Sequence, residues 1–420
     1  MKNHTFLKKI IADSETKIQK FNSYKLLDNA FSTADIFAGI KVLISRQITM
    51  SSAVFRFEKE FAKFVGAKYA VMVNSGSSAN LLSVFAACNP LRKNRFKIGD
   101  EAIIPALCWS TSLWPLVQAG LKPVFVDIDK STLNIDIDEL IKKITPRTKV
   151  IMAVHVLGNS SDIKKIKNIC DKKNIILIED TCESLGSKFK NKYLGTYGDF
   201  GTYSFYYSHQ ITCGEGGAVV CNSFDDYKLL YSLRAHGWAR GPNEPKKNDP
   251  ILRKRDSKFI FINSGFNLRS TDLAAAIASS QLKRLNKFIK IRSNNREKII
   301  KKIIQSKKWN YQFSFMKKSN FVTPSWFGLP IFIDKKFIKI KRKFLNYLEK
   351  AGIENRPIIS GNFLNQPCTK LYNLNPKNLK FKNAQEVEER GFFIGIHTHP
   401  ITKKQLLLIE KAMFSIDKFI

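Results

Sequence analysis

The chain has 420 residues, of which 44% are hydrophobic, enough to bury the core of one large domain and of a smaller one. Its net charge of +35 at pH 7 would suit a nucleic-acid-binding protein. The charge is carried mostly by lysines, on helix-like stretches such as EKIIKKIIQSKKW. We therefore expect solvated helix faces and no nucleic-acid partner. No apolar run approaches the roughly 18 residues that span a bilayer, and the N-terminal MKNHTFLKKIIADSETK lacks an apolar signal core, so we expect a cytoplasmic protein without a membrane partner.

The predicted elements start with helices over residues 1 to about 50. From Tyr69 onward, short apolar runs alternate with helix-like stretches, and this alternation predicts an α/β fold with a mostly parallel sheet. Ligands bind such sheets beyond the C-terminal ends of the strands. The predicted strands are 69–73, 102–105, 123–127, 149–156, 175–180, 201–206 and 217–220.

The second part of the chain is predicted to hold a smaller α/β domain. A helical run over about 273–304 connects it to the first domain, and a strand over 327–333 and a helix over 337–351 follow. The sequence therefore predicts a large domain over 1–300 and a small one over 301–420, with a boundary uncertain by roughly ten residues.

The seven cysteines are scattered and odd in number, as expected for reduced thiols. No pair has the C-x-x-C spacing, so we predict neither a metal site nor an iron–sulfur cluster. They stand at positions 88, 108, 170, 182, 213, 221 and 368.

The segment NSGSSAN (74–80) lies between a predicted strand and a predicted helix. Its small residues let backbone N–H groups approach an anion at the helix N-terminus, where the dipole also favours negative charge. Gly76 and Ser77 are therefore candidate phosphate-binding residues. The alternative is an ordinary strand–helix turn.

Several chemically useful side chains follow other predicted strands. Asp180 ends IILIED, and Glu183 stands three residues later; both also suit the first turn of a helix. Trp109 in PALCWSTS offers an aromatic face, or else packs in a core. Ser204 offers a hydroxyl that could equally bond nearby backbone. His209 lies in the turn of TYSFYYSHQITCGEGGAVV, where an isolated histidine would more often be structural.

These motifs occur in one order along the chain and resemble the pyridoxal 5′-phosphate (PLP)-dependent nucleotide-sugar aminotransferase superfamily (DegT/DnrJ/EryC/StrS type). The resemblance covers about residues 40–415 and includes VHVLGN (154–159), GFNLRSTDLAAAIASSQL (265–282), NRPIISGNF (355–363) and GFFIGIHTHP (391–400). It implies the aspartate aminotransferase-like fold (PLP fold type I) and a homodimer whose active sites form at the subunit interface.

The resemblance assigns a role to each candidate residue. Asp180 would face the pyridine nitrogen of PLP and Trp109 would stack on its ring. Glu183, where many relatives have glutamine, would lie beside the cofactor. The phosphate would be held by Gly76, Ser77 and Ser204, and by Asn267 from the partner subunit. Substrate contacts are implied for His236, Arg240 and Arg356, which could equally be solvated surface residues.

His209 stands where the family has the lysine that forms the Schiff base with PLP. An imidazole cannot make that bond, but it can move a proton near neutral pH. This substitution resembles the 3-dehydratases that form 3,6-dideoxysugars. L-glutamate would supply the amino group that turns PLP into pyridoxamine 5′-phosphate (PMP), and His209 would act as the base while the C3 hydroxyl leaves as water.

Two branches of 3-dehydratase are open. One acts on a CDP-linked 4-keto-6-deoxyglucose and carries an iron–sulfur cluster; the other acts on GDP-4-keto-6-deoxymannose and has none. Because no cysteine lies between Asn222 and Asn267, we expect the second branch. RAHGWAR (234–240) resembles both branches. Gln210 departs from the pattern, since a second histidine is often found there.

Two other functions compete with this one. The first is an ordinary sugar aminotransferase that uses another lysine, such as Lys188 or Lys192, although neither lies in the expected turn. The second is a catalytically silent relative that acts as a basic binding or regulatory protein. The presence of Asp180, Glu183 and Ser204 together argues against the silent relative.

Overall fold

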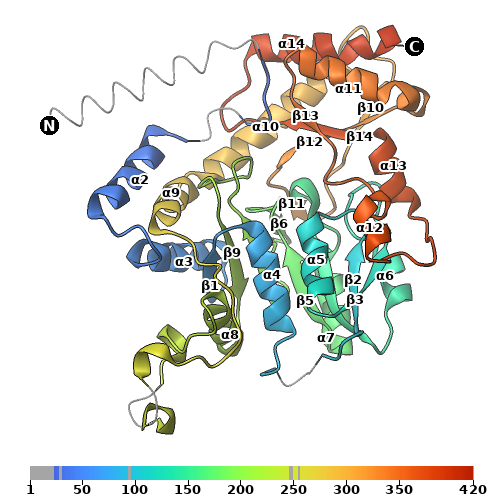
Figure 1. Ribbon diagram of the computed structural model, residues 1–420. Coiled ribbons are helices and arrows are strands. Elements are labelled where there is room, and N and C mark those ends of the chain that lie inside the picture. Colours follow the sequence, from blue (N-terminus) through green and yellow to red (C-terminus); the bar gives the residue numbers. More distant parts are fainter. Residues whose placement is uncertain (1–22, 28–30, 93–95, 246–248, 254–255, 420) are drawn as a thin grey trace, which may run out of the picture.

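The computed structural model of the chain describes residues 23–27, 31–92, 96–245, 249–253 and 256–419 (Figure 1). Its largest sheet has seven strands in the order β1-β9-β8-β5-β4-β2-β3. Neighbouring strands from β8 to β3 run parallel, and β9 is antiparallel to both of its neighbours. The strands are β1 (Tyr69–Val73), β2 (Glu101–Pro105), β3 (Lys122–Val126), β4 (Thr148–Val154), β5 (Ile176–Asp180), β8 (Phe200–Ser204) and β9 (Gly217–Cys221).

Both faces of this sheet are covered, which is why its strands are almost continuously apolar. Along β1, Val71 and Val73 point into one core, whereas Ala70 and Met72 point into another. On the first side lie α4 (Gly76–Ala87), α5 (Ser110–Gln118) and α8 (Phe224–Arg234); on the second lie α3 (Ser52–Val65) and α9 (Asp272–Leu282). Two further helices, α6 (Ile137–Lys143) and α7 (Ile163–Lys173), pack near β3 and β5.

A second sheet has four antiparallel strands in the order β10-β12-β14-β13. These are β10 (Phe313–Phe315), β12 (Gly328–Ile333), β13 (Asn355–Arg356) and β14 (Gly391–Gly395), with α11 (Lys341–Lys350), α12 (Pro367–Leu371), α13 (Lys382–Arg390) and α14 (Lys403–Met413) around them. The 20-residue helix α10 (Leu285–Ile304) joins the two sheets along the chain (Figure 1). The division into domains 1–300 and 301–420 stays a prediction, with its boundary inside the C-terminal half of α10.

The predicted strands of the first sheet agree with the observed ones to within one or two residues at each end. The helical run predicted over 273–304 is in fact two helices, α9 and α10, interrupted at Lys283 and Arg284. The predicted helix over 337–351 begins as a 3₁₀ turn (Lys335–Ile340) before α11. A small sheet of β11 (Val322–Thr323), β6 (Lys188–Phe189) and β7 (Lys192–Tyr193) was not predicted.

Helices were predicted over residues 1–50, of which 1–22 and 28–30 lie outside the described residues. From Ser32 the chain forms α2 (Thr33–Ser45), whose N-cap Ser32 and Asp35 make a reciprocal capping box. Before it, Tyr24 is extended instead: it pairs with Ile353, and its N–H donates to the Gly352 carbonyl at 2.6 Å. This segment therefore lies beside the chain that leads into β13.

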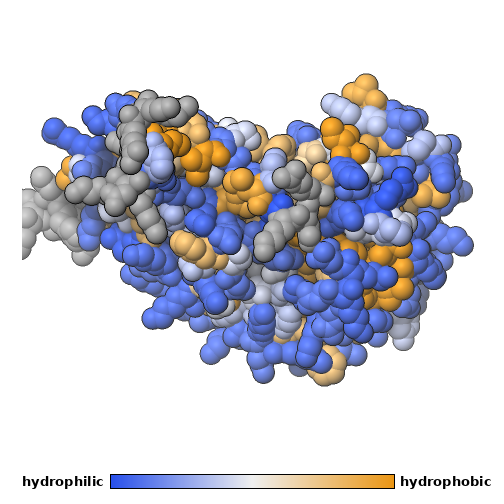
Figure 2. Space-filling model, turned by 90° about the horizontal axis from the view of Figure 1, so that it is seen from below, coloured by the Kyte–Doolittle hydropathy of each residue, from blue (hydrophilic) through white to orange (hydrophobic). Residues whose placement is uncertain are grey.

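The surface in Figure 2 is mostly hydrophilic, in keeping with the lysine-rich composition. Among the residues that the structure describes, no helix combines the length and apolarity needed to cross a membrane. All seven cysteines are free thiols.

Candidate active site

A cavity of about 610 Å³ lies beyond the C-terminal ends of β4, β5 and β8, where the second sheet meets the first. Such a position is where ligands bind in open α/β sheets. The predicted site residues that line it are Gly76, Ser77, Trp109, Asp180, Glu183, Ser204, His209 and Arg356. Residues far apart in sequence thus meet in one place.

One end of the cavity is the N-terminus of α4. The side chain of the N-cap Ser75 accepts a hydrogen bond from the Ser78 N–H at 3.0 Å, and no described residue accepts one from the N–H groups of Gly76 or Ser77. A Cβ atom at Gly76 would lie 2.5 Å from the Ser204 Cβ, so only glycine allows Ser204 to reach this end. Free amides and a hydroxyl at a helix N-terminus are the kind of donors that bind an anion.

Asp180 is the last residue of β5 and is buried. Its Oδ2 accepts hydrogen bonds from Asn80 Nδ2 at 2.8 Å and Ser112 Oγ at 2.7 Å, and its Oδ1 accepts one from the Cys182 N–H at 3.1 Å. The Asn80 amide is oriented because its Oδ1 accepts from Thr202 Oγ1 at 2.6 Å. Three donors fix the carboxylate at the cavity wall, in position to face a cationic group there.

Glu183 is the second carboxyl group of the cavity. Its Oε2 accepts a hydrogen bond from the Leu157 N–H at 3.0 Å. Burial nevertheless raises its pKa from 4.5 to about 7; the Leu157 amide opposes this rise and the negative charge of Asp180 adds to it. Two carboxyl groups of one cavity thus differ in environment, and Glu183 is able to hold a proton near neutral pH.

His209 lies in the turn after β8, and its ring meets the edges of Phe327 at 5.1 Å and Tyr206 at 6.0 Å between ring centroids. Within the described chain, its Nδ1 has no hydrogen-bond partner. Burial lowers its pKa from 6.5 to about 3, and the nearby guanidinium of the buried Arg292 lowers it further. The imidazole is therefore neutral at pH 7, the form that accepts a proton.

No lysine lines the cavity among the residues that the structure describes. Lys188 and Lys192 lie on β6 and β7, outside the lining, where their ammonium groups sit over the rings of Tyr193 (4.4 Å) and Tyr197 (4.6 Å). Neither offers an amine to this site.

Trp109 and Arg356 form the more open wall. Trp109 is the N-cap of α5 and is 57% exposed, so its ring is not a core residue. Arg356, on β13, is ion-paired with Glu354 at 2.6 Å and keeps about half of its side chain in solvent. An aromatic face and a guanidinium are thus both available to a ligand.

The structure does not bring Asn267, His236 and Arg240 into the cavity lining. Asn267 is exposed and accepts a hydrogen bond from Arg269 Nε at 3.0 Å. The Arg240 guanidinium lies 3.9 Å from the centre of the Trp238 ring, which His236 meets edge-on. In the described chain these three residues lie outside the cavity, so its lining does not support the roles predicted for them.

Sequence reasoning missed other residues of the site. Asn80 and Ser112 hold Asp180, and buried His155 lines the cavity while its Nε2 lies 3.0 Å from Glu179 Oε2. Asn80 and Ser112 each lie within four residues of a predicted site residue, which is the one signal that could have indicated them. Phe327 comes from the distant second sheet and has no such signal.

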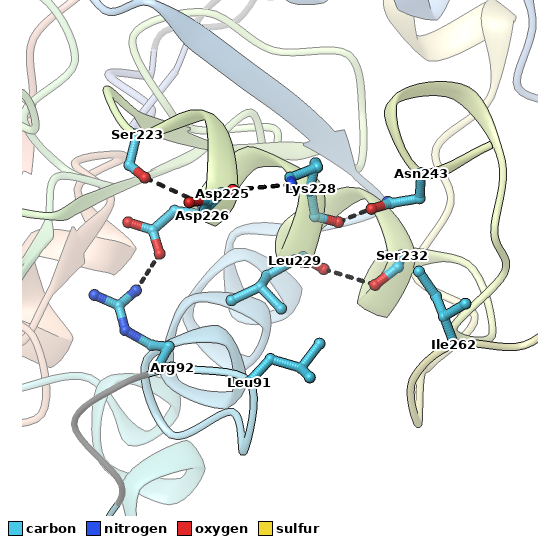
Figure 3. A pocket seen from close by; sticks show the side chains of 10 residues that line it. All are labelled: Leu91, Arg92, Ser223, Asp225, Asp226, Lys228, Leu229, Ser232, Asn243 and Ile262. Atoms are coloured by element: carbon cyan, nitrogen blue, oxygen red, sulfur yellow. Dashed lines mark hydrogen bonds and ion pairs between the residues drawn. The ribbon is translucent and has the colours of Figure 1, made fainter. Parts of the chain in front are cut away.

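A second large cavity, of about 550 Å³, lies against α8 (Figure 3). Among the described residues, its lining shares none with the first cavity. Its polar side chains satisfy one another: Arg92 is ion-paired with Asp226, Lys228 with Asp225, and Ser232 Oγ donates to the Leu229 carbonyl (Figure 3). Its opposite charges are paired with one another, and beyond these pairs no described lining residue has a shifted pKa. This cavity is therefore a weaker candidate for the active site.

Comparison with known proteins identifies the family of the chain. The model of the DegT/DnrJ/EryC1/StrS aminotransferase family matches residues 33–411. GDP-4-keto-6-deoxy-D-mannose 3-dehydratases of Escherichia coli O55:H7 and Yersinia pseudotuberculosis are 41% and 38% identical over 380 residues. Each alignment covers 89% of this chain, and 95% and 94% of the relatives.

Solved structures are similar over nearly the whole chain. A GDP-4-keto-6-deoxymannose 3-dehydratase with a histidine-to-asparagine substitution and bound GDP-perosamine has a TM-score of 0.84 at 38% identity, covering 93% of this chain and 100% of that one. The same enzyme with a trapped PLP–glutamate geminal diamine has a TM-score of 0.83 at 37% identity, covering 92% and 99%.

An aminotransferase of Helicobacter pylori, at 23% identity, shares the fold alone, with a TM-score of 0.81 over 95% of this chain and 99% of that one. The predicted aspartate aminotransferase-like fold is confirmed. From the family match and these identities, the chain belongs to the DegT/DnrJ/EryC1/StrS aminotransferase family.

Proposed function

We propose that this chain is a PLP-dependent 3-dehydratase that removes the C3 hydroxyl of a nucleotide-linked 4-keto-6-deoxysugar, with GDP-4-keto-6-deoxymannose as substrate and L-glutamate as amino donor. The observation that carries the proposal is the combination found in the cavity. It has free amides at a helix N-terminus and a buried carboxylate, as an aminotransferase site would need, but an imidazole and, among the described lining residues, no lysine.

The cavity fits PLP on three counts. The free N–H groups of Gly76 and Ser77, with the Ser204 hydroxyl, suit the phosphate. Asp180, held by three donors, suits the protonated pyridine nitrogen. Trp109 offers an exposed face against which a flat ring can stack, which matters more when no lysine tethers the cofactor.

When bound, PLP would supply an electron sink and, after amination by L-glutamate, a primary amine that reacts with the C4 ketone of the sugar. Asp180 sustains the sink because a fixed negative charge keeps the ring nitrogen protonated. Glu183, with a pKa raised to about 7, is able to donate or accept a hydrogen bond beside the cofactor.

His209 would be the base. Its ring is neutral and has no hydrogen-bond partner at Nδ1 in the described chain, so it is free to accept a proton from the carbon next to the amine. The protonated ring would then be able to return a proton to the departing C3 hydroxyl, which leaves as water. A lysine here would capture the cofactor covalently and favour amino transfer instead.

The overall reaction balances without an outside oxidant. L-glutamate loses two electrons and its amino group and becomes 2-oxoglutarate. The sugar gains those two electrons, loses the C3 oxygen as water and keeps the ketone at C4. The amino group is released as ammonia, because hydrolysis of the enamine product consumes one water and restores the ketone.

The GDP-linked sugar is proposed from the relatives, which are named for it or bind GDP-perosamine. Arg356, half in solvent at the cavity wall, is a candidate contact for the sugar or diphosphate. A homodimer is part of the proposal, because it would let Asn267, His236 and Arg240 act in the partner's site. A cytoplasmic location is also proposed, and the seven free thiols are consistent with a reducing compartment.

The experiment is a substrate panel. The protein with PLP and L-glutamate is incubated with GDP-, CDP-, dTDP- and UDP-linked 4-keto-6-deoxysugars, and products are read by mass spectrometry. We expect loss of one oxygen atom from the GDP-linked sugar, and 2-oxoglutarate in equal amount. An amino sugar as the main product would show that the chain is an aminotransferase. The absence of any glutamate-dependent change in the PLP absorbance would show a silent protein.

A further inference from the structure

Gln210, the residue after His209, is buried to 2% exposure and makes an unusual pair of contacts. Its Nε2 donates hydrogen bonds to the Glu183 carbonyl at 2.5 Å and to the Ser325 carbonyl at 3.1 Å. Because both partners are carbonyl oxygens, only the NH₂ side of the amide can face them, which fixes the orientation of the side chain. One amide therefore uses both of its hydrogens on two separate backbone segments.

These two segments carry the rest of the active site. Glu183 lies three residues beyond Asp180. Ser325 lies just before β12 and two residues before Phe327, whose ring packs against His209 and whose carbonyl accepts a hydrogen bond from Arg292 at 2.5 Å. Gln210 thus ties the His209 turn to the carboxylate-bearing loop and to the entry of the second sheet.

In the part of the chain that the structure describes, no hydrogen bond holds the imidazole of His209. Its Nδ1 is unpartnered in the described part of the chain, and its aromatic contacts are with Phe327 and Tyr206. The ring direction is consequently set by where the backbone of the turn lies and by where Phe327 lies. Gln210 holds the backbone of the turn, to which it is covalently joined, and also the segment that carries Phe327, to which it is hydrogen-bonded.

We propose that Gln210 is a positioning residue for the reaction: its side-chain amide clamps the loop after β5 and the segment before β12 around the His209 turn, and so aims the imidazole. The inference deepens the proposed function and rests on it for the role of His209. The clamp itself depends on hydrogen bonds, and it requires two donor hydrogens on the side-chain nitrogen of residue 210. A methionine has the right length and no donor; an ionised glutamate has the right shape but presents an oxygen to two carbonyls.

The test uses the PLP-loaded full-length protein and two variants, Gln210→Met and Gln210→Glu. For Gln210→Met we expect kcat for release of the 3-deoxy product to fall about 10- to 100-fold, as for a misaimed catalytic group, with KM changed less than about threefold. The matched control is Gln312→Met. Gln312 is 3% exposed, and its Nε2 donates two hydrogen bonds at 2.9 Å, to Lys308 O and Asp417 Oδ2, outside the cavity. Its kcat should stay at the unsubstituted value.

The pH series separates a clamp from a merely structural role. A buried glutamate at position 210 regains one donor when it is protonated, so the activity of Gln210→Glu relative to Gln210→Met should rise as pH falls from 8 to 6. Both variants retain the charged and ionisable groups described around this position, so a pH-dependent difference between the two variants reports residue 210. These groups are Glu183, His209, Arg284, Arg292 and His399. A ratio independent of pH would overturn the clamp.

A second measurement needs no activity. In hydrogen exchange of the cofactor-free protein, residues 209–213 and 325–327 should exchange faster in Gln210→Met than in Gln312→Met. Equal exchange in those segments, or an unchanged kcat in a folded Gln210→Met, would show that Gln210 does not position the site. If instead the unsubstituted protein released no 3-deoxy product, the proposed function would fail. Hydrogen exchange would still test whether Gln210 holds the two segments together.

Discussion

The two perturbed groups of the cavity predict opposite effects of pH on the stability of the cofactor-free protein. The pKa of His209 is lowered from 6.5 to about 3. Below pH 6.5 the unfolded chain therefore binds a proton at this histidine, whereas the folded chain does not bind one until about pH 3. This difference in proton binding lowers the free energy of unfolding as pH falls. At pH 5 the difference spans 1.5 pH units, which corresponds to about 2 kcal/mol at 1.36 kcal/mol per unit.

Glu183 acts in the other direction. Its pKa is raised from 4.5 to about 7, so the folded chain binds a proton that the unfolded chain does not take up until pH 4.5. This stabilises the fold as pH falls through 7, and between pH 7 and pH 5 the gain is again about 2 kcal/mol. The two terms nearly cancel in the unsubstituted protein, so single substitutions are needed to reveal them.

The assay is urea unfolding of the cofactor-free protein, followed by tryptophan fluorescence at one protein concentration, at pH 7 and pH 5. Relative to the unsubstituted chain, His209→Asn should gain about 2 kcal/mol on going from pH 7 to pH 5, and Glu183→Gln should lose about 2 kcal/mol. The double variant should follow the unsubstituted chain. If His209→Asn and the unsubstituted chain changed in parallel, the imidazole would not be held neutral by its surroundings and the argument from burial would be refuted.

Four further outcomes are expected. Asp180→Asn should fold normally but slow glutamate-dependent conversion of PLP by about 100-fold or more, since the ring nitrogen loses its charge partner; a normal rate in stopped-flow absorbance would remove that role. Gly76→Ala should weaken PLP binding by roughly tenfold, or about 1.4 kcal/mol, because a Cβ would lie 2.5 Å from the Ser204 Cβ. Equal affinity in a fluorescence titration would argue against the N-terminus of α4 as the phosphate site. His209→Lys should give an absorbance band that borohydride fixes onto residue 209, with no 3-deoxy product. Activity should require a dimer completed by Asn267 of the second subunit, and a fully active monomer in sedimentation and dilution assays would exclude this.

Much of the large sheet could be predicted because each strand is an apolar run with polar residues at its ends. β1 agrees with the sequence prediction at both ends for this reason. The break between α9 and α10 could not be predicted, since Lys283 and Arg284 are good helix formers and the chain bends there only because the helices pack on different neighbours. The pairing of Tyr24 with Ile353 joins residues more than 300 positions apart and leaves no local pattern.

The residues of the candidate site also differ in whether the sequence alone indicates them. Residues that end a strand or begin a helix, such as Asp180 and Gly76, carry a local signal, because those positions face the sheet edge in any α/β fold. Phe327 carries none, because its role arises from contacts between the two sheets. Gln210 departs from the family pattern in the sequence, but its bonds to the Glu183 and Ser325 carbonyls could not be predicted, because the folded chain alone brings these segments together. The lowered pKa of His209 likewise comes from burial under Phe327 and from Arg292 on α10, which only the folded chain brings together.

The central claim is that an imidazole in place of a lysine makes this chain a dehydratase. The most direct measurement is the mass of the sugar nucleotide after incubation of the protein with PLP, L-glutamate and GDP-4-keto-6-deoxymannose, beside the same incubation with His209→Asn. We expect a product that lacks one oxygen atom, formed by the unsubstituted protein and not by the variant. A product in which the C4 ketone has become an amine, or loss of oxygen at the same rate in His209→Asn, would contradict it.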